Sequence, residues 1–166
     1  MGIYFCLVLH ADVCGFAHIN DLCAQRLAVE GKMIEHLEIL LRLIFSVIAG
    51  GLIGLEREVV HKPAGVRTHM LVCLGSALFA LATLETLPEE TAKVMAAVAT
   101  GISFLGAGTI FKSKSAVHGL TTAASIWVVA AIGLSIGVGL YLISLITAIL
   151  TLLVLNLDRI EFFRKL

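Results

Sequence analysis

Five apolar runs follow one another along the chain, with short polar segments between them. The runs cover residues 37–55, 70–87, 94–111, 120–136 and 138–157. Each is close to the length of about 20 largely apolar residues that a helix needs to cross a bilayer. The runs are continuous, whereas strands of a membrane β-barrel alternate apolar and polar residues over about ten positions. The pattern therefore predicts an all-α, polytopic transmembrane helical bundle with about five spans.

The segments between the runs contain residues that stop helices. Pro63 and Gly65 mark a turn in the polar loop after the first run, and Pro88 ends the second run. Only Gly137 and its neighbours separate the fourth run from the fifth. A connection this short predicts that 120–136 and 138–157 form an antiparallel helical hairpin.

Residues 1–32 lack this order. An apolar stretch begins at Ile3, but His10 and Asp12 interrupt it before a span is complete. The stretch also lacks the basic start and the cleavage site of a signal peptide. We expect residues 1–32 to be a poorly structured leader before a transmembrane domain at 33–166. The alternative is that the natural protein starts at Met33.

Four potential metal ligands recur every four residues in this leader, on one face of a helix: Cys6, His10, Cys14 and His18. Cysteine and histidine bind zinc well, but closed zinc sites usually gather ligands from a turn as well as from a helix. One straight helical face therefore favours no bound metal, and we expect no cofactor.

Composition strengthens the membrane assignment. Hydrophobic residues make up 59% of the 166 residues, charged residues make up 14%, and the mean hydropathy is +1.02. In a soluble domain about a quarter of the residues are charged, and a chain of this size could not bury so much apolar surface without a bilayer. The formal net charge of +0 also argues against a nucleic-acid partner. The lipid bilayer is therefore the first partner that the sequence predicts.

Lysine and arginine are distributed unevenly over the two sides that five spans define. Eight of them follow the first run, the third run or the fifth run: Arg57, Lys62, Arg67, Lys112, Lys114, Arg159, Arg164 and Lys165. Counted from Met33, the loops of the opposite side contain only Lys93. Basic residues collect on the cytoplasmic side of a membrane. We therefore expect the N-terminus outside and the C-terminus in the cytoplasm.

Charged and polar residues bracket the first predicted cytoplasmic loop: Glu56, Arg57, Glu58, Arg67, Thr68 and His69. Ionisable residues at membrane depth are costly and often functional, so this polar cluster is a candidate site for an ion, a phosphate or a partner. The structural alternative is that Glu56 and Arg67 pair and hold the first two runs together. The sequence shows neither a serine, histidine and acid constellation nor paired carboxylates, so we expect no catalytic residue and no enzyme.

Small residues form a second candidate face, for helix packing or for function: Gly50, Gly54, Gly101, Gly106, Gly108, Gly119, Thr121 and Thr122. Glycines let membrane helices approach closely, and the G-x-x-x-G at 50–54 is a known packing motif. The spacing at 101–108 lacks the Gly-Lys-Ser/Thr ending of a phosphate-binding loop. Helix packing is therefore the favoured interpretation of these glycines.

Four motifs follow one another in the runs: GLIGLERE at 51–58, AGVRTHMLVCLGSALF at 64–79, GISFLGAGTIF at 101–111 and GLTTAASIWVVAAIGL at 119–134. Together they resemble the MgtC/SapB family of membrane proteins over about residues 37–157. The resemblance implies a multi-pass protein of the bacterial plasma membrane, linked to growth at low magnesium. Some members of that family are tied to virulence, and some restrain the ATP synthase. Longer members add a soluble cytoplasmic domain after the last span, and this sequence stops before one.

Two functions from different classes follow. One is a regulator that contacts another membrane complex, such as the ATP synthase, through its small-residue faces. The other is a transporter or channel for Mg²⁺ or another ion, which needs oxygen ligands near mid-membrane. Glu38 and Glu85 lie near the ends of their runs, so the sequence favours the regulator. A homo-oligomer that builds a polar path from glycine carbonyls keeps the second function open.

Overall fold

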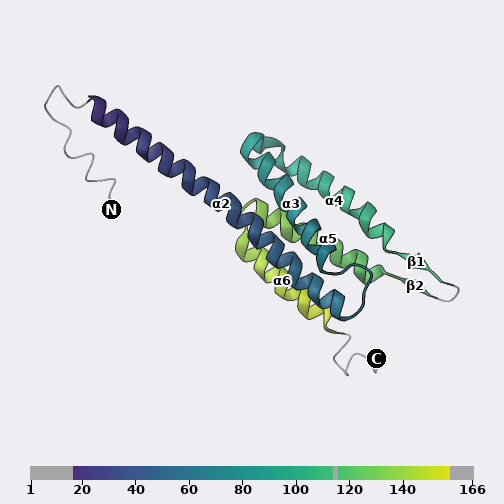
Figure 1. Cartoon of the computed structure of the whole chain (residues 1–166). Coiled ribbons are helices and arrows are strands. Elements are labelled where there is room, and N and C mark those ends of the chain that lie inside the picture. Colours follow the sequence, from purple (N-terminus) through teal and green to yellow (C-terminus); the bar gives the residue numbers. More distant parts are fainter. Residues whose placement is uncertain (1–16, 114–115, 158–166) are drawn as a thin grey trace. The chain divides into compact units, whose positions relative to one another are not determined.

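The computed structural model describes residues 17–113 and 116–157, with the side chains of 36–113 and 116–157. The chain divides into two units, Met1–Glu38 and Ile39–Leu166. Helix α2 (Ala17–Val59) begins in the first unit and ends in the second (Figure 1). Residues 17–32, expected to be poorly structured, therefore belong to a helix. They contain no proline and only one glycine, so little interrupts helix formation.

The predicted ligand series of the leader falls largely outside this description. Cys6, His10 and Cys14 lie outside the described residues, as does the side chain of His18.

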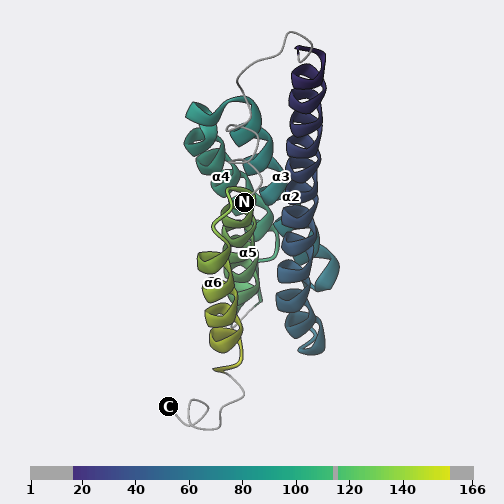
Figure 2. The ribbon, with the colours of Figure 1, turned by 90° about the vertical axis from the view of Figure 1, so that its left-hand side faces the viewer.

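The second unit is built from helices that run roughly alongside one another (Figures 1 and 2). After α2 come α3 (Val66–Thr86), the short 3-10 helix η1 (Pro88–Glu90), α4 (Thr91–Gly108), α5 (Leu120–Gly137) and α6 (Tyr141–Leu155). In the described part of the chain, the strands are the two-residue segments β1 (Phe111–Lys112) and β2 (Val117–His118). The predicted all-α fold is confirmed.

Four segments are long and apolar enough to cross a membrane: His36–Val59, Val66–Thr86, Pro88–Gly108 and Leu120–Gly137. The chain is therefore a multi-pass membrane protein. The last helix, α6, is apolar but has 15 residues, so it is about 22 Å long. It is shorter than the fifth apolar run because residues 138–140 form the turn that precedes it.

The turn between α5 and α6 is held by α2. Gly139 has a φ of +86°, in the left-handed region that favours glycine. Arg42 of α2 donates from Nη1 to the Gly137 carbonyl at 2.8 Å and from Nε to the Tyr141 hydroxyl at 3.1 Å. The ring of Phe45 packs edge-on against Tyr141, with 6.3 Å between ring centroids. Arg42 thus donates to a carbonyl at the end of α5 that has no N–H donor inside that helix.

Helix α5 is the most buried of the four candidate spans. In the apolar stretch of 18 residues within α5, 56% is buried inside the protein, against 11% of the corresponding stretch in the span that contains α4. A Cβ built on Gly133 would collide with the Cys73 carbonyl of α3, and one built on Gly137 would lie 2.5 Å from the Ala77 carbonyl. These two glycines therefore let α5 approach the backbone of α3. The apolar core around this contact includes Ile53, Val72, Ile126, Val129, Ile132 and Ile136.

The basic segment after α4 forms a hairpin, which the sequence had suggested only as a short break. Strands β1 and β2 are antiparallel, with Phe111 opposite His118 and Lys112 opposite Val117. The rings of Phe111 and His118 stack with 5.3 Å between centroids. The hairpin lies at the same end of the second unit as the loop between α2 and α3 (Figure 1).

Candidate functional site

The polar cluster predicted from the sequence lies where α2 ends and α3 begins (Figure 1). The side chains of Arg57 and Glu56 are 2% and 9% exposed. Arg57 donates from Nε to Glu56 Oε2 at 2.6 Å and from Nη2 to Oε1 at 3.1 Å. A buried charge needs such a partner, because removing it from water is costly. The remaining guanidinium nitrogen, Nη1, is buried and has no hydrogen-bond partner among the described residues.

His69 connects this cluster to the core. It is 0% exposed on α3, with Nδ1 2.9 Å from the Gly65 carbonyl and Nε2 3.1 Å from Ser125 Oγ of α5. Ser125 Oγ also lies 2.8 Å from the Thr122 carbonyl, a second acceptor for its proton. A buried network of hydrogen bonds therefore joins α3 to α5, and α2 packs against it at Gly54.

The hydrogen bonds of His69 define two proton arrangements. A carbonyl only accepts, so Nδ1 must donate to Gly65. A neutral ring then accepts at Nε2 from the Ser125 hydroxyl. A charged ring instead donates from Nε2 to Ser125 Oγ, and the hydroxyl proton goes to Thr122. The hydroxyl of Ser125 thus has two acceptors, and the protonation of His69 decides between them.

Two glycines of α2 bring that helix against His69. A Cβ built on Gly50 would lie 2.5 Å from the His69 carbonyl oxygen, and one built on Gly54 would lie 2.6 Å from the Cα of Val66. Side chains at either position would push α2 and α3 apart. The G-x-x-x-G at 50–54 therefore faces α3 at the level of the buried network.

Glu58 accepts a hydrogen bond from the backbone at the same junction. Its Oε2 accepts from the N–H of Val66, the first residue of α3, at 2.9 Å. The first N–H groups of a helix have no acceptor inside it, and a carboxylate there also complements the helix dipole. The N–H of His61, whose φ is 55°, donates to the Glu58 carbonyl at 3.0 Å and helps close the loop.

The structure departs from the predicted pair of Glu56 with Arg67. Glu56 engages its neighbour Arg57, while Arg67 and Thr68 are exposed. Because α3 begins at Val66 and a helix turns about 100° per residue, 67 and 68 lie on its outer side. The same geometry turns His69 inward, so its side chain is buried within the bundle.

Comparison with known proteins relates this geometry to a family. The profile of the MgtC family matches residues 43–161, which include the α2–α3 junction, His69 and Ser125. The chain belongs to the MgtC family.

Three relatives show how this MgtC-family chain compares with longer proteins. YhiD of Escherichia coli, provisionally named a magnesium transporter, is 43% identical over 128 residues, which cover 72% of this chain and 60% of YhiD. SrpB of Synechococcus elongatus is 38% identical over 143 residues, covering 75% of this chain and 79% of SrpB. The protein MgtC of Salmonella typhimurium is 39% identical over 113 residues, covering 68% of this chain and 49% of MgtC. The chain thus spans about half of the Salmonella protein. No solved structure matches it.

The glycines of α4 in this MgtC-family chain have different surroundings. Gly106 is buried, and a Cβ built there would lie 3.5 Å from Ala123 of α5. Gly101 and Gly108 are exposed, and a Cβ on either would meet no described atom within 4 Å. The favoured interpretation, helix packing, therefore describes Gly106 within the chain but not Gly101 or Gly108.

The start of α5 holds the last three residues of the predicted face. Gly119 precedes α5 with a φ of +88°, and a side chain there would collide with the Thr109 carbonyl. Thr122 is buried and its carbonyl accepts from Ser125, whereas Thr121 is exposed. Of the two threonines, Thr122 belongs to the buried network.

Sequence analysis missed Ser125, Gly133 and Gly137 as candidate residues. The two glycines form a second G-x-x-x-G, so the signal was present at the end of the fourth run and directly after it. Ser125 follows His69 by 56 residues, and no spacing along the chain indicates their contact. It exists because α3 and α5 pack closely at Gly133 and Gly137.

The arrangement at the α2–α3 junction can hold a charge and a proton out of contact with water. Its members are a buried arginine with one nitrogen unpaired within the described part of the chain, a carboxylate, and a histidine that bridges two helices. Among the described residues, no three histidine, cysteine, aspartate or glutamate side chains converge as metal ligands.

Proposed function

We propose that this chain supports bacterial growth when magnesium is scarce, as a regulator that contacts another complex in the cell membrane. Membership of the MgtC family and the name of YhiD support the link to magnesium. The family resemblance makes the ATP synthase the first partner to test.

The regulatory proposal rests on the outward face of α4. The span that contains α4 is only 11% buried within the chain. Small exposed residues recur along it at helical spacing: Ala96, Thr100, Ser103 and Ala107. The hydroxyls of Thr100 and Ser103 donate to carbonyls of their own helix, so neither hydroxyl needs a donor or acceptor from a partner. Small residues at this spacing let a second membrane helix approach closely.

Leucine substitutions on this face test the contact. Ser103→Leu and Ala107→Leu keep α4 apolar but hold an approaching helix away. We expect normal insertion, loss of growth at low Mg²⁺ and loss of co-purification with the ATP synthase. Ala82→Leu, which adds the same side chain at an exposed position of α3, is the matched control. The proposal fails if both leucine variants of α4 keep growth and co-purification, or if the control is equally defective.

A transporter or channel for Mg²⁺ is the second candidate. The name of YhiD and the buried polar network at the α2–α3 junction favour it. Against it, the middle of the bundle is filled by Ala77, Val129 and Ile132, each at most 1% exposed, whereas Mg²⁺ needs oxygen ligands or a hydrated path. The deciding measurement is Mg²⁺ entry into proteoliposomes that contain only this protein. Uptake above that of empty vesicles would support the transporter and contradict the regulator.

The proposed orientation keeps the N-terminus outside and the C-terminus in the cytoplasm. Lys62 and Arg67 flank the turn between α2 and α3, and Lys112 belongs to β1. All three are exposed, and the two segments lie at one end of the second unit (Figure 1). Basic residues gathered at one end support a cytoplasmic location for that end.

A further inference from the structure

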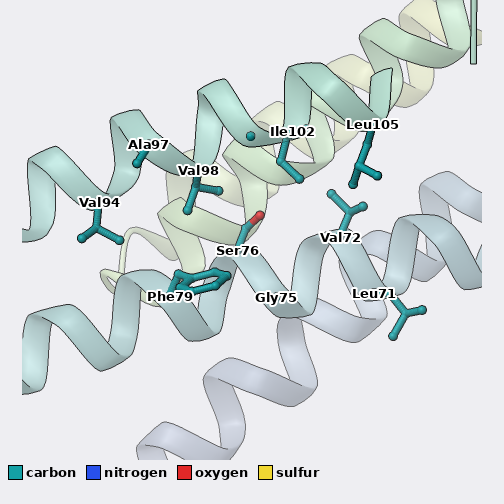
Figure 3. Close-up of a pocket in the computed structure, with 11 residues that line it drawn as sticks. Leu71, Val72, Gly75, Ser76, Phe79, Val94, Ala97, Val98, Ile102 and Leu105 are labelled. Atoms are coloured by element: carbon teal, nitrogen blue, oxygen red, sulfur yellow. The ribbon is translucent and has the colours of Figure 1, made fainter. Parts of the chain in front are cut away.

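A cleft of about 520 Å³ separates α3 from α4 (Figure 3). Val72 and Phe79 line it from α3, and Val98, Ile102 and Leu105 line it from α4. The α4 residues recur at three- and four-residue spacing, so one face of that helix looks into the cleft. Leu71, Phe79 and Leu105 at its rim are 68%, 60% and 51% exposed. The cleft is therefore open to the surroundings of the bundle and has space for another molecule.

Glycines on both walls widen the cleft. Gly75 of α3 and Gly101 of α4 both line it, and a Cβ built on either would meet no described atom within 4 Å. A Cβ built on Gly133, by contrast, would collide with the backbone of α3. Gly75 and Gly101 therefore leave room, whereas Gly133 brings two helices together.

One polar atom in the cleft has no partner. Ser76 is 2% exposed, and its Oγ is buried without a hydrogen-bond partner among the described residues. Figure 3 shows this oxygen pointing from α3 toward α4. Other hydroxyls of the spans, such as those of Ser46, Thr83 and Ser103, donate to a carbonyl of their own helix. Ser76 makes no such bond, although it lines the cleft.

The depth of Ser76 restricts what can reach it. Ser76 lies ten residues from each end of α3, which is about 15 Å along the helix axis. That places it near the middle of the hydrocarbon core, where ions and polar headgroups are excluded. The ligand must therefore be apolar and enter from the bilayer. The carbonyl groups of phospholipids lie at the interface, so their acyl chains present no acceptor at this depth.

We propose that the cleft binds a slender apolar molecule dissolved in the bilayer that carries one hydrogen-bond acceptor, such as a ketone or ether oxygen. The Ser76 hydroxyl donates to that oxygen, and the faces of α3 and α4 enclose the hydrocarbon part. The site lies away from both the outward face of α4 and the network around His69, so it does not depend on the regulatory proposal.

Quenching of a single tryptophan tests the site in nanodiscs. Trp127 is the only tryptophan of the chain, so the parent variant combines Trp127→Phe with Phe79→Trp at the rim of the cleft. The probes are bromoundecanone, a methyl ketone brominated at its far end, and bromoundecane, its alkane counterpart. Bromine quenches tryptophan on contact. The quantity compared is the mole fraction of probe in the lipid that quenches half of the accessible fluorescence.

We expect half-quenching by the ketone at a mole fraction about threefold to tenfold below that of the alkane, the usual effect of one hydrogen bond in a membrane protein. Ser76→Ala should bring the ratio to about one. Ser103→Ala, which removes an exposed hydroxyl of α4 outside the cleft, should leave the ratio unchanged. Gly101→Leu should fill the cleft and weaken quenching by both probes.

Three results would overturn the proposal. They are equal half-quenching by the two probes in the parent, a ratio that survives Ser76→Ala, and quenching that Gly101→Leu leaves unchanged. The first would mean that the cleft accepts plain acyl chains. The circular dichroism spectrum of Ser76→Ala checks that the helices are intact, so a lost ratio reports the missing hydroxyl.

Discussion

Removal of the Glu56 carboxylate should destabilise the protein much more than removal of an exposed acid. The Glu56 and Arg57 side chains are 9% and 2% exposed and make contacts of 2.6 and 3.1 Å. Glu56→Ala leaves the guanidinium buried, with Nη1 already without a partner among the described residues. Breaking a buried pair costs about 3–5 kcal/mol, whereas an exposed pair contributes about 0–1 kcal/mol. We expect a loss of about 3 kcal/mol, because Arg57 lies in the last turn of α2, close to water.

The free energy of unfolding can be measured by reversible unfolding in mixed micelles, followed by circular dichroism. Glu90→Ala is the matched control, because Glu90 pairs with Lys93 at 2.7 Å while the two side chains are 44% and 76% exposed. The control should lose less than about 1 kcal/mol. Arg67→Ala should lie within about 0.5 kcal/mol of the wild type, since its side chain is exposed and Glu56 pairs elsewhere.

A double variant separates the pair from its two residues. Glu56→Ala combined with Arg57→Leu leaves no unpaired charge buried, so it should be more stable than Glu56→Ala alone. Equal losses for Glu56→Ala and Glu90→Ala would refute the reasoning. So would a double variant whose loss equals the sum of the single losses, because additivity indicates that the two side chains are not coupled.

Three further predictions follow from the packing and the charge distribution. Gly54→Ala should cost about 1–3 kcal/mol because its Cβ would lie 2.6 Å from the next helix. Gly101→Ala, inside α4 with no described atom within 4 Å of the new Cβ, should stabilise by about 0.5–1 kcal/mol, and melting temperatures in one detergent check both. Ser125→Ala should cost about 0.6–2 kcal/mol in the same assay, because the buried histidine loses its hydroxyl partner, and wild-type stability would contradict the network. A reporter fused after Val60 should be cytoplasmic and one near Glu89 external, and a cytoplasmic signal near Glu89 would show that the orientation is wrong.

Hydropathy along the chain was sufficient to predict the class of fold and the position of most helices. The apolar runs at 70–87 and 120–136 correspond to α3 (Val66–Thr86) and α5 (Leu120–Gly137) to within a few residues. This works because a membrane helix must be apolar over its whole length and must satisfy its own backbone. Both conditions apply within one stretch of about 20 residues, so the sequence of that stretch is enough to recognise the helix. The order of the four motifs likewise sufficed to predict the family.

The rotation of each helix about its axis was decided only by the tertiary structure. In a membrane, a face that packs against protein is as apolar as one that faces lipid, so hydropathy does not distinguish them. Gly54 and Gly108 show this, because the first is pressed against α3 and the second is exposed. The start and packing of α3 also decide which residues pair. They place His69 beside Ser125, 56 residues away, and leave Glu56 paired with Arg57. The sequence by itself determined the apolar lengths and hence the helices, whereas contacts between helices arose only when their backbones came together.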